Sequence, residues 1–361
     1  MKVGSGRLAA ALVLVVGAAC ACSSSDPTPA SPSASAPGST VGVPRTLVDH
    51  LQVPWGVAFL PNGSALVGER TTAHLLRVQP DGTKMVLGTI PGVVPAGEGG
   101  LLGLALSPTY PRDHLVYAYL TAAHDNRVVR FRLDGNRIGE PDPILTGITK
   151  AAVHNGGRIA FGPDHLLYVT VGDATDGARA QDRDSLNGKV LRVTADGQAA
   201  PGNPFGNRVF TMGHRNVEGL AWGPAKRLYE TEFGENTFDE INLLVSGKNY
   251  GWPTVEGHDD RDRFQQPLIT WPTEDASPSG VAYAAGALWV GALRGERLWR
   301  VPVRANGSLG TPAAFFTGKY GRIRTVALAP DGSLWLTTSN RDGRGSPTGA
   351  DDRIVRVSIR R

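Results

Sequence analysis

The sequence predicts an all-β protein folded as a six-bladed β-propeller. The 361 residues include 46 glycines and 26 prolines, and apolar stretches of helical period are scarce beyond the N-terminus. An apolar strand, a Pro/Gly/Asp turn and a second apolar strand recur six times, at spacings of 45 to 61 residues. Repeats of about 40–60 residues with short strands are typical of propeller blades. The first strands begin near Gly56, Gly103, Arg158, Gly219, Gly280 and Thr325.

One copy of the repeat, residues 154–173 (HNGGRIAFGPDHLLYVTVGD), shows the pattern clearly. A Gly-Pro-Asp turn at residues 162–164 joins two apolar, β-rich runs, which favours a hairpin. Because hairpin strands are antiparallel, the entry of the first strand and the exit of the second lie at the same end. We therefore expect His154, Asn155 and Asp173 to converge on one face.

A propeller must also close into a ring. Residues 353–359 (RIVRVSI) offer a third strand for the last blade, and residues 45–49 (RTLVD) offer its fourth. A closed ring leaves few free strand edges, so we expect a monomer.

Residues 1–19 are predicted to be a lipoprotein-type signal peptide. Basic residues precede the apolar run Leu8–Ala19, which is too short to span a bilayer. Small residues precede Cys20 and Cys22, the only two cysteines, and indicate lipid attachment at one of them. An ordinary secretory signal is the alternative. The protein is thus expected outside the cytoplasm, anchored to the membrane by an N-terminal lipid or secreted.

Residues 20–44 form a Ser/Pro/Ala-rich tether, which is too polar to fold, and residues 45–361 form the propeller domain. The domain contains no cysteine, so no disulfide braces it despite the expected location. The net charge of +4 is modest and no basic run is present, which argues against nucleic acid as a partner.

Polar side chains stand directly before several of the first strands. Loops entering the innermost strands of a propeller crowd one face, so these side chains should meet at one mouth of the ring. Guanidinium groups bind carboxylates through paired hydrogen bonds, and the set therefore indicates an anionic ligand. It consists of Glu98, His154, Arg215, Asn216, Arg322 and Arg324.

Several runs together resemble one known family, the soluble glucose dehydrogenases and aldose sugar dehydrogenases, also called glucose/sorbosone dehydrogenases. They are GEGGLLGLALSP (97–108), HNGGRIAFGPD (154–164), LNGKVLRV (186–193), GHRNVEGLAW (213–222), DEINLLVSGKNYGWP (239–253) and GRIR (321–324). The resemblance implies a six-bladed propeller that uses pyrroloquinoline quinone (PQQ) to oxidise aldose sugars to lactones. No CxxCH haem motif is present, so the electrons would pass to an external acceptor.

The resemblance also implies roles for individual residues. His154 matches the general base that takes the proton of the sugar hydroxyl, a role that suits a neutral imidazole. Arg215 and Asn216 match contacts to the quinone, with Arg215 helping to polarise its reactive carbonyl. The cofactor carboxylates would be bound by Arg322 and Arg324, and Arg294 matches another position that lines the cofactor.

Calcium is implied at two places. Backbone carbonyls at Gly234 and Glu235 match the ion that contacts the cofactor, and Glu240 and Tyr250 match a second, structural calcium site. Oxygen ligands of this kind suit a hard cation.

Three positions depart from the family pattern. Glu98 replaces a glutamine, Glu235 replaces a proline, and Val153 replaces an aspartate. The charge of Glu98 should weaken binding of an anionic cofactor unless an arginine neutralises it or Glu98 is protonated, so Glu98→Gln is expected to tighten binding.

Two other functions are weighed against the dehydrogenase. A non-catalytic binding propeller that has lost PQQ is supported by Glu98. A calcium-dependent, lactonase-type hydrolase would need several carboxylates and asparagines around one axial metal, whereas the candidate residues are mainly histidine and arginine. The acidic loop from Asp173 to Asp184 is interpreted as solvated, and Trp252, Trp271 and Trp289 as core residues.

Overall fold

The computed structural model describes Met1, residues 40–260 and residues 263–360. The predicted signal peptide, Cys20, Cys22 and most of the predicted tether lie outside the described residues. Within these ranges no helix is long and apolar enough to cross a membrane. Residues from Ser39 onward form one unit, and its strands build the fold.

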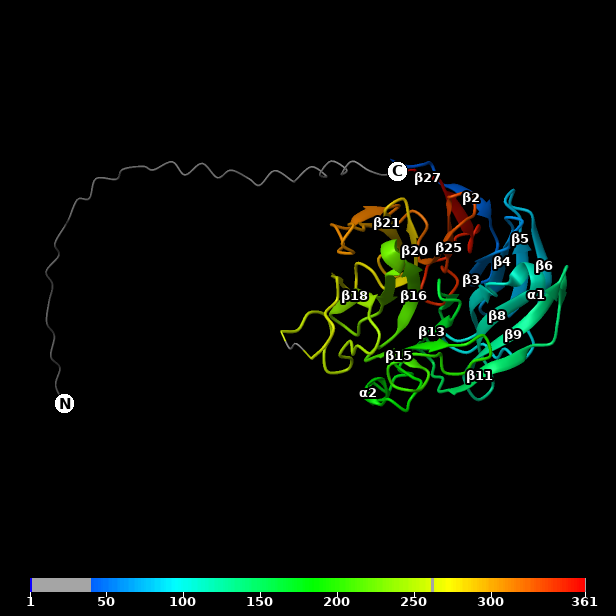
Figure 1. Cartoon of the computed structure of the whole chain (residues 1–361). Helices are drawn as coiled ribbons and strands as arrows, with labels where there is room; N and C mark the ends of the chain where they lie inside the picture. The colour runs from blue at the N-terminus through cyan, green and yellow to red at the C-terminus, as the bar shows by residue number, and fades with distance from the viewer. Residues whose placement is uncertain (2–39, 261–262, 361) are drawn as a thin grey trace, which may run out of the picture. The chain divides into compact units, whose positions relative to one another are not determined.

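Six antiparallel sheets stand around a common axis, which confirms the predicted six-bladed propeller (Figure 1). The first blade contains β3 (Pro54–Phe59), β4 (Ala65–Glu69), β5 (His74–Val78) and β6 (Lys84–Thr89). The second contains β7 (Leu101–Leu106), β8 (Leu115–Thr121) and β9 (Asn126–Asp134), with β10 (Arg137–Ile138) and β11 (Asp142–Ile148) both paired to β9. The third contains β12 (Ile159–Phe161), β13 (Leu167–Val171), β14 (Lys189–Val193) and β15 (Val209–Met212).

The remaining three blades follow the same order. The fourth contains β16 (Val217–Trp222), β17 (Leu228–Glu232), β18 (Phe238–Leu244) and β19 (Ile269–Pro272). The fifth contains β20 (Pro278–Ala284), β21 (Ala287–Ala292), β22 (Arg297–Pro302) and β23 (Ala313–Phe315). The sixth contains β24 (Ile323–Leu328), β25 (Leu334–Thr338), β26 (Ile354–Val357) and β2 (Arg45–Val48). The short helices are α1 (Tyr110–Asp113), α2 (Ala178–Gln181) and the 3₁₀ turn η1 (Pro224–Lys226).

The ring closes as predicted, because β2 from the start of the domain pairs antiparallel with β26 from its end. In Figure 1 the blue of β2 lies beside the red of the C-terminal strands, and β26 is its neighbour in the sheet. A second pairing joins β1 (Thr40–Val41) to β27 (Ile359–Arg360). Thr40 and Val41, at the end of the stretch predicted as tether, are therefore already paired with the C-terminal strand.

The glycine that opens most repeats has a steric reason. The innermost strands β24, β3, β7 and β12 contact one another in that order around the axis, and β16 contacts β20, which contacts β24. A Cβ atom at Gly56 would lie less than 3.0 Å from the carbonyl oxygen of Leu102, and one at Gly103 equally close to that of Gly157. The same crowding holds at Gly219 and Gly280. Glycine is thus required where one inner strand passes across the next.

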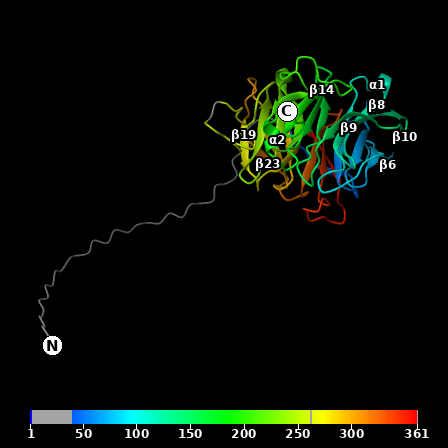
Figure 2. The ribbon, with the colours of Figure 1, turned by 90° about the horizontal axis from the view of Figure 1, so that it is seen from below.

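Seen from the side in Figure 2, the strands run between the two faces of the ring and the loops gather at those faces. The apolar faces of the blades pack against each other around the axis. Trp55, Trp289 and Trp335 are fully buried between them, and Trp271 is also buried, which confirms the core assignment of Trp271 and Trp289. This packing fixes the inner strands and hence the loops that enter them.

We predict that Gly103→Ala destabilises the propeller by about 1–3 kcal/mol, the usual cost of overpacking a tight core. Gly349→Ala is the matched control, because a Cβ atom at Gly349 meets nothing within 4 Å. Urea unfolding of both variants measures the difference. Equal stability of the two variants would contradict the steric account.

Candidate active site

The hairpin of β12 and β13 brings His154 and Asp173 together, as the sequence predicts. The Nδ1 atom of His154 lies 2.8 Å from Oδ1 of Asp173. Asp173 is 1% exposed, and burial would raise its pKa, but its hydrogen bond and charge interaction with His154 and the N–H of Thr175 lower the pKa below the usual value. An ionised carboxylate accepts a hydrogen bond from the protonated Nδ1, which leaves Nε2 of His154 as the acceptor.

The second oxygen of Asp173 accepts a hydrogen bond from the indole Nε1 of Trp252 at 2.8 Å. The interpretation of residues 173–184 as a solvated loop is thus wrong for Asp173, whose carboxylate is buried by its two partners. Trp252 also differs from its predicted core position, because it lines a cavity together with His154. The face of its ring lies 5.4 Å from the guanidinium carbon of Arg215.

The backbone of His154 is held by Glu98. The N–H of His154 donates to Oε2 of Glu98 at 3.0 Å, and the other oxygen of Glu98 forms an ion pair with Arg344. The φ angle of His154 is 58°, a left-handed conformation that is costly for a residue with a side chain. Such conformations persist where their surroundings hold them, and the contact with Glu98 does so here.

Two neighbouring cavities lie at this mouth of the ring. The first measures about 510 Å³, and its lining includes His154, Asp173, Arg215, Glu235 and Trp252. The second measures about 280 Å³, and its lining includes Glu98, Arg294, Arg322, Arg324 and Arg344. They adjoin at the hydrogen bond between Glu98 and His154. The structure therefore brings together an imidazole, a buried carboxylate and a group of guanidinium ions.

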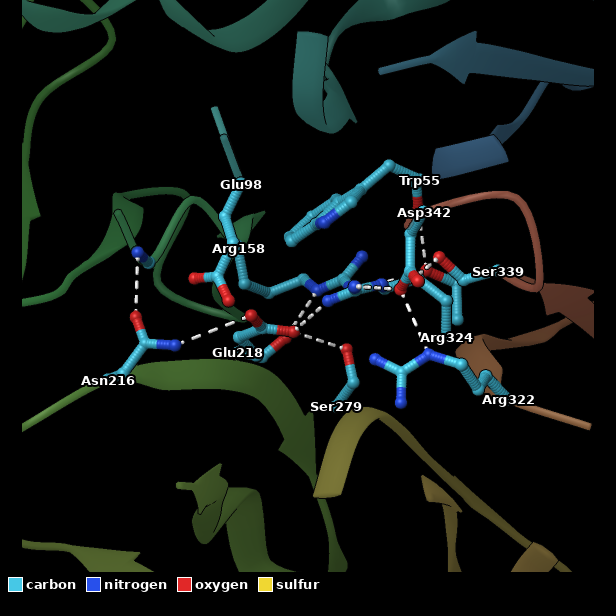
Figure 3. Close-up of polar contacts among 12 residues, drawn as sticks. Trp55, Glu98, Arg158, Asn216, Glu218, Ser279, Arg322, Arg324, Ser339 and Asp342 are labelled. Atoms are coloured by element: carbon cyan, nitrogen blue, oxygen red, sulfur yellow. Dashed lines mark hydrogen bonds and ion pairs between the residues drawn. The ribbon is translucent and has the colours of Figure 1, made fainter. Parts of the chain in front are cut away.

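The arginines of the second cavity continue into a buried ion network along the axis (Figure 3). Arg324 pairs with Glu218 at 2.6 Å and with Asp342 at 3.5 Å, and Arg322 pairs with Asp342 at 3.0 Å. Glu218 also accepts a hydrogen bond from the hydroxyl of Ser279 at 2.6 Å. Two of the predicted carboxylate-binding arginines are thus already partly neutralised by carboxylates of the chain.

Arg158 adds a further buried cation to this network. Its Nε donates to the carbonyl oxygen of Glu218 at 2.9 Å, and its guanidinium lies 4.1 Å from the ring centre of Trp55. Burial lowers its pKa to about 10. The guanidiniums of Arg158, Arg322 and Arg324 therefore face the two carboxylates of Glu218 and Asp342, and the excess positive charge favours an anionic ligand above them.

Asn216 lies behind the cavities and lines neither of them. It is 1% exposed, and its Oδ1 accepts the N–H of Gly156 at 2.9 Å. Its Nδ2 points to Glu218 at 3.4 Å. In this arrangement Asn216 fixes the backbone next to His154, a role that the motif alone did not reveal.

The candidate calcium ligands collect around the loop between β17 and β18. A small cavity of about 20 Å³ is lined by Gly234, Glu240, Tyr250 and Glu232, among others, while Glu235 lies on the first cavity. Within the described part of the chain, no hydrogen-bond donor reaches the carbonyl oxygens of Gly234 or Glu235. Free carbonyls and nearby carboxylates fit a hard cation.

The charges around the small cavity also favour a bound cation. Burial raises the pKa of Glu240 to about 8, and the neighbouring Glu232 adds to the rise. A cation here would offset this repulsion. The phenol of Tyr250 donates to the carbonyl of Leu243 at 2.6 Å, so its hydroxyl is committed elsewhere.

A buried group formed by His214, Glu230 and Glu232 lies next to this cavity. Both ring nitrogens of His214 already have partners, Thr211 at 2.9 Å and Glu232 at 2.9 Å. Its imidazole is therefore not open to a metal in this arrangement, and we assign it a structural role beside Arg215.

The family model for glucose/sorbosone dehydrogenase matches residues 51–354. The chain belongs to this family of oxidoreductases. The PQQ-bound aldose sugar dehydrogenase of Streptomyces coelicolor is 52% identical, with a TM-score of 0.86 over 89% of this chain and 98% of that one. The aldose sugar dehydrogenase of Escherichia coli is 28% identical over 84% of this chain and 92% of that protein. Quinoprotein glucose dehydrogenase B of Acinetobacter calcoaceticus is 30% identical over 67% of this chain and 59% of that protein.

Sequence reasoning missed several site residues of this family member. Asp342 and Arg344 come from the loop after β25, and nothing in RDGRG (341–345) distinguishes it from an ordinary polar loop. Trp252 directly follows the KNYG part of the recognised DEINLLVSGKNYGWP run, so its position in that motif was the available signal. Glu218 stands two residues after Asn216, on an inner strand where a buried carboxylate requires a buried cation.

We predict that Asp173→Asn lowers turnover at least about 10²-fold, because the histidine loses the partner that fixes its tautomer. The folded-state pKa of Asp173 is depressed, so its stabilising contribution is present above the unfolded pKa and is lost as pH falls through the folded pKa. In urea unfolding, the free energy of unfolding of Asp173→Asn should therefore be lower than that of the wild type at pH 7. This difference should shrink in strong acid. The exposed Asp176→Asn is the control, and a deficit that grew in acid would contradict the account.

Proposed function

We propose that this protein oxidises the C1 position of aldose sugars to lactones with PQQ as the cofactor. The observation that carries the proposal is the His154–Asp173 pair beside a cavity lined by arginines. The pair provides a base for a hydroxyl proton, and the arginines suit a cofactor with several carboxylates. The similarity to a PQQ-bound aldose sugar dehydrogenase supports the same assignment.

His154 would act as the base. Asp173 holds the Nδ1 proton, and Nε2 has no hydrogen-bond partner in the described part of the chain. Nε2 would accept the proton of the C1 hydroxyl, and Asp173 would stabilise the resulting imidazolium. When bound, PQQ supplies a two-electron acceptor for the hydride that leaves C1. The lining of the first cavity by Trp252 gives the sugar an aromatic wall.

The cofactor would be held by the second cavity. Arg294 is exposed there, and among the described residues its Nη1 donates to Thr273 Oγ1 alone, at 3.3 Å, so it is available to a ligand carboxylate. Arg322 and Arg324 contribute from the buried side, oriented by Asp342 and Glu218. Arg215, between the first cavity and the small calcium cavity, would face the quinone.

Calcium would bind through the carbonyls of Gly234 and Glu235 beside the cofactor. A second ion would bind near Glu240 and the backbone of Tyr250. The unengaged carbonyls and the raised pKa of Glu240 support this part of the proposal.

The alternative of a non-catalytic binding propeller loses its main support, because Arg344 neutralises Glu98. A hydrolase built around an axial metal is disfavoured, because the two cavities gather a histidine and arginines around the axis. We further propose an extracytoplasmic, lipid-anchored or secreted monomer that passes electrons to an external acceptor, on the basis of the N-terminal sequence, the closed ring and the missing haem motif.

Calorimetric titration of the purified protein with PQQ and Ca²⁺, followed by dye reduction with aldoses, tests the function. We expect a Kd of about 1 μM or tighter and sugar-dependent reduction. His154→Ala should bind PQQ nearly as well but turn over about 10²–10⁴-fold more slowly. Absence of PQQ binding would contradict the proposal, and binding without turnover by the wild type would favour a binding protein.

The ion pair between Glu98 and Arg344 gives a separate prediction. The Arg344 side chain is 56% exposed and that of Glu98 18%, so solvent partly screens the pair. Arg344→Gln should still weaken PQQ binding several-fold to tenfold, because Glu98 then repels the anionic cofactor. Glu98→Gln, expected from sequence to tighten binding, should now have little effect.

The double variant Glu98→Gln/Arg344→Gln should bind like Glu98→Gln alone. Titration of the wild type, the two single variants and the double variant with PQQ gives the coupling free energy between residues 98 and 344. Additive effects of the two substitutions would show that Arg344 does not act through Glu98.

A further inference from the structure

The loop between β17 and β18 directs five successive amide hydrogens toward carboxylates. The N–H of Gly234 donates to Oδ1 of Asp239 at 2.9 Å. The next four N–H groups all donate to the same oxygen, Oε1 of Glu256. The distances are 2.7 Å from Glu235, 3.1 Å from Asn236, 2.9 Å from Thr237 and 3.0 Å from Phe238.

This arrangement sets the direction of the backbone carbonyls. In a planar trans peptide, the C=O of one residue points opposite to the N–H of the next. Because the N–H groups of Glu235 and Asn236 point to Glu256, the carbonyls of Gly234 and Glu235 point away from it. Among the described residues, no donor reaches either of these two carbonyls.

The fit of Glu256 against the loop is close. A Cβ atom at Gly234 would lie 2.5 Å from Oε1 of Glu256 and would collide with the carbonyl of Phe238. A glycine at this position therefore lets the loop wrap the carboxylate. Hydrogen bonds of this kind also polarise the peptide groups and make their carbonyl oxygens better ligands for a cation.

The same segment reaches the second candidate calcium position. The N–H of Gly257 donates to Oε1 of Glu240 at 2.7 Å. Residues 256 and 257 thus contact both groups of proposed metal ligands, one through a side chain and the other through the backbone.

We propose that Glu256 is a positioning residue for calcium, which holds the carbonyls of Gly234 and Glu235 in the orientation that binds the ion. Glu256 does not touch the ion in this role; it acts from the opposite side of the loop. The inference rests on the calcium site of the proposed function. It makes metal affinity depend on a side chain outside the DEINLLVSGKNYGWP motif.

The test is a calcium titration of chelator-treated protein by calorimetry, which needs neither PQQ nor turnover. Glu256→Gln keeps the size of the side chain but removes the charge that accepts four donors, and it should weaken the calcium Kd at least about tenfold. Glu256→Asp keeps the charge with a shorter reach and should give a smaller loss. Glu274→Gln, an exposed position just after β19, is the control and should bind as the wild type does.

Thermal unfolding in excess chelator separates metal affinity from folding. The expected result is a similar unfolding temperature for Glu256→Gln and the wild type without calcium, and a smaller rise for the variant when calcium is added. Wild-type affinity in both Glu256 variants would overturn the inference alone. A wild-type protein without calcium binding would overturn it together with the metal part of the proposed function. Should Glu256→Gln fail to fold, Glu256→Asp decides by the same titration.

Discussion

The buried ion pair between Glu218 and Arg324 is the interaction on which the rest of the site depends. Both side chains are about 5% exposed, so neither charge could remain there without the other. Removing one partner of such a pair typically costs about 3–5 kcal/mol, because the remaining charge is left unpaired in the interior. The pair joins the inner strand of the fourth blade to that of the sixth (Figure 3). It therefore holds these two inner strands together at the axis, and it orients Arg324, which lines the second cavity.

Around this axis, the site is assembled from side chains far apart in the sequence. His154 depends on Asp173 for its tautomer and on Glu98 for its strained backbone. Glu98 in turn depends on Arg344, which lies 246 residues further along the chain. Different blades supply these groups, and closure of the ring brings them together. A substitution in one loop can therefore change the net charge at this face of the ring without altering the strands that form the fold.

The charge balance explains how an anionic ligand and several carboxylates can share one mouth. Glu98, Glu218 and Asp342 each face an arginine. Arg324 lowers the pKa of Asp342, and Arg322 adds to the effect, so the carboxylate stays ionised although burial opposes it. The carboxylates thus orient the guanidinium groups without cancelling all of their charge. The loop between β17 and β18 has a related arrangement, in which carboxylates of Glu256 and Asp239 accept its backbone N–H groups.

The sequence by itself determined the six-fold repeat, the closure of the ring and the position of His154, because strand periodicity, turn residues and the inner-strand glycines are local signals. It also placed Asp173 at the same lip as His154, since both ends of one hairpin must meet. Only the tertiary structure decided that Arg344 neutralises Glu98, that Asn216 lies behind the cavity and that Glu256 accepts the amides of the loop between β17 and β18. These contacts join segments from different parts of the chain, and charge compensation depends on distance in space, which no local pattern encodes.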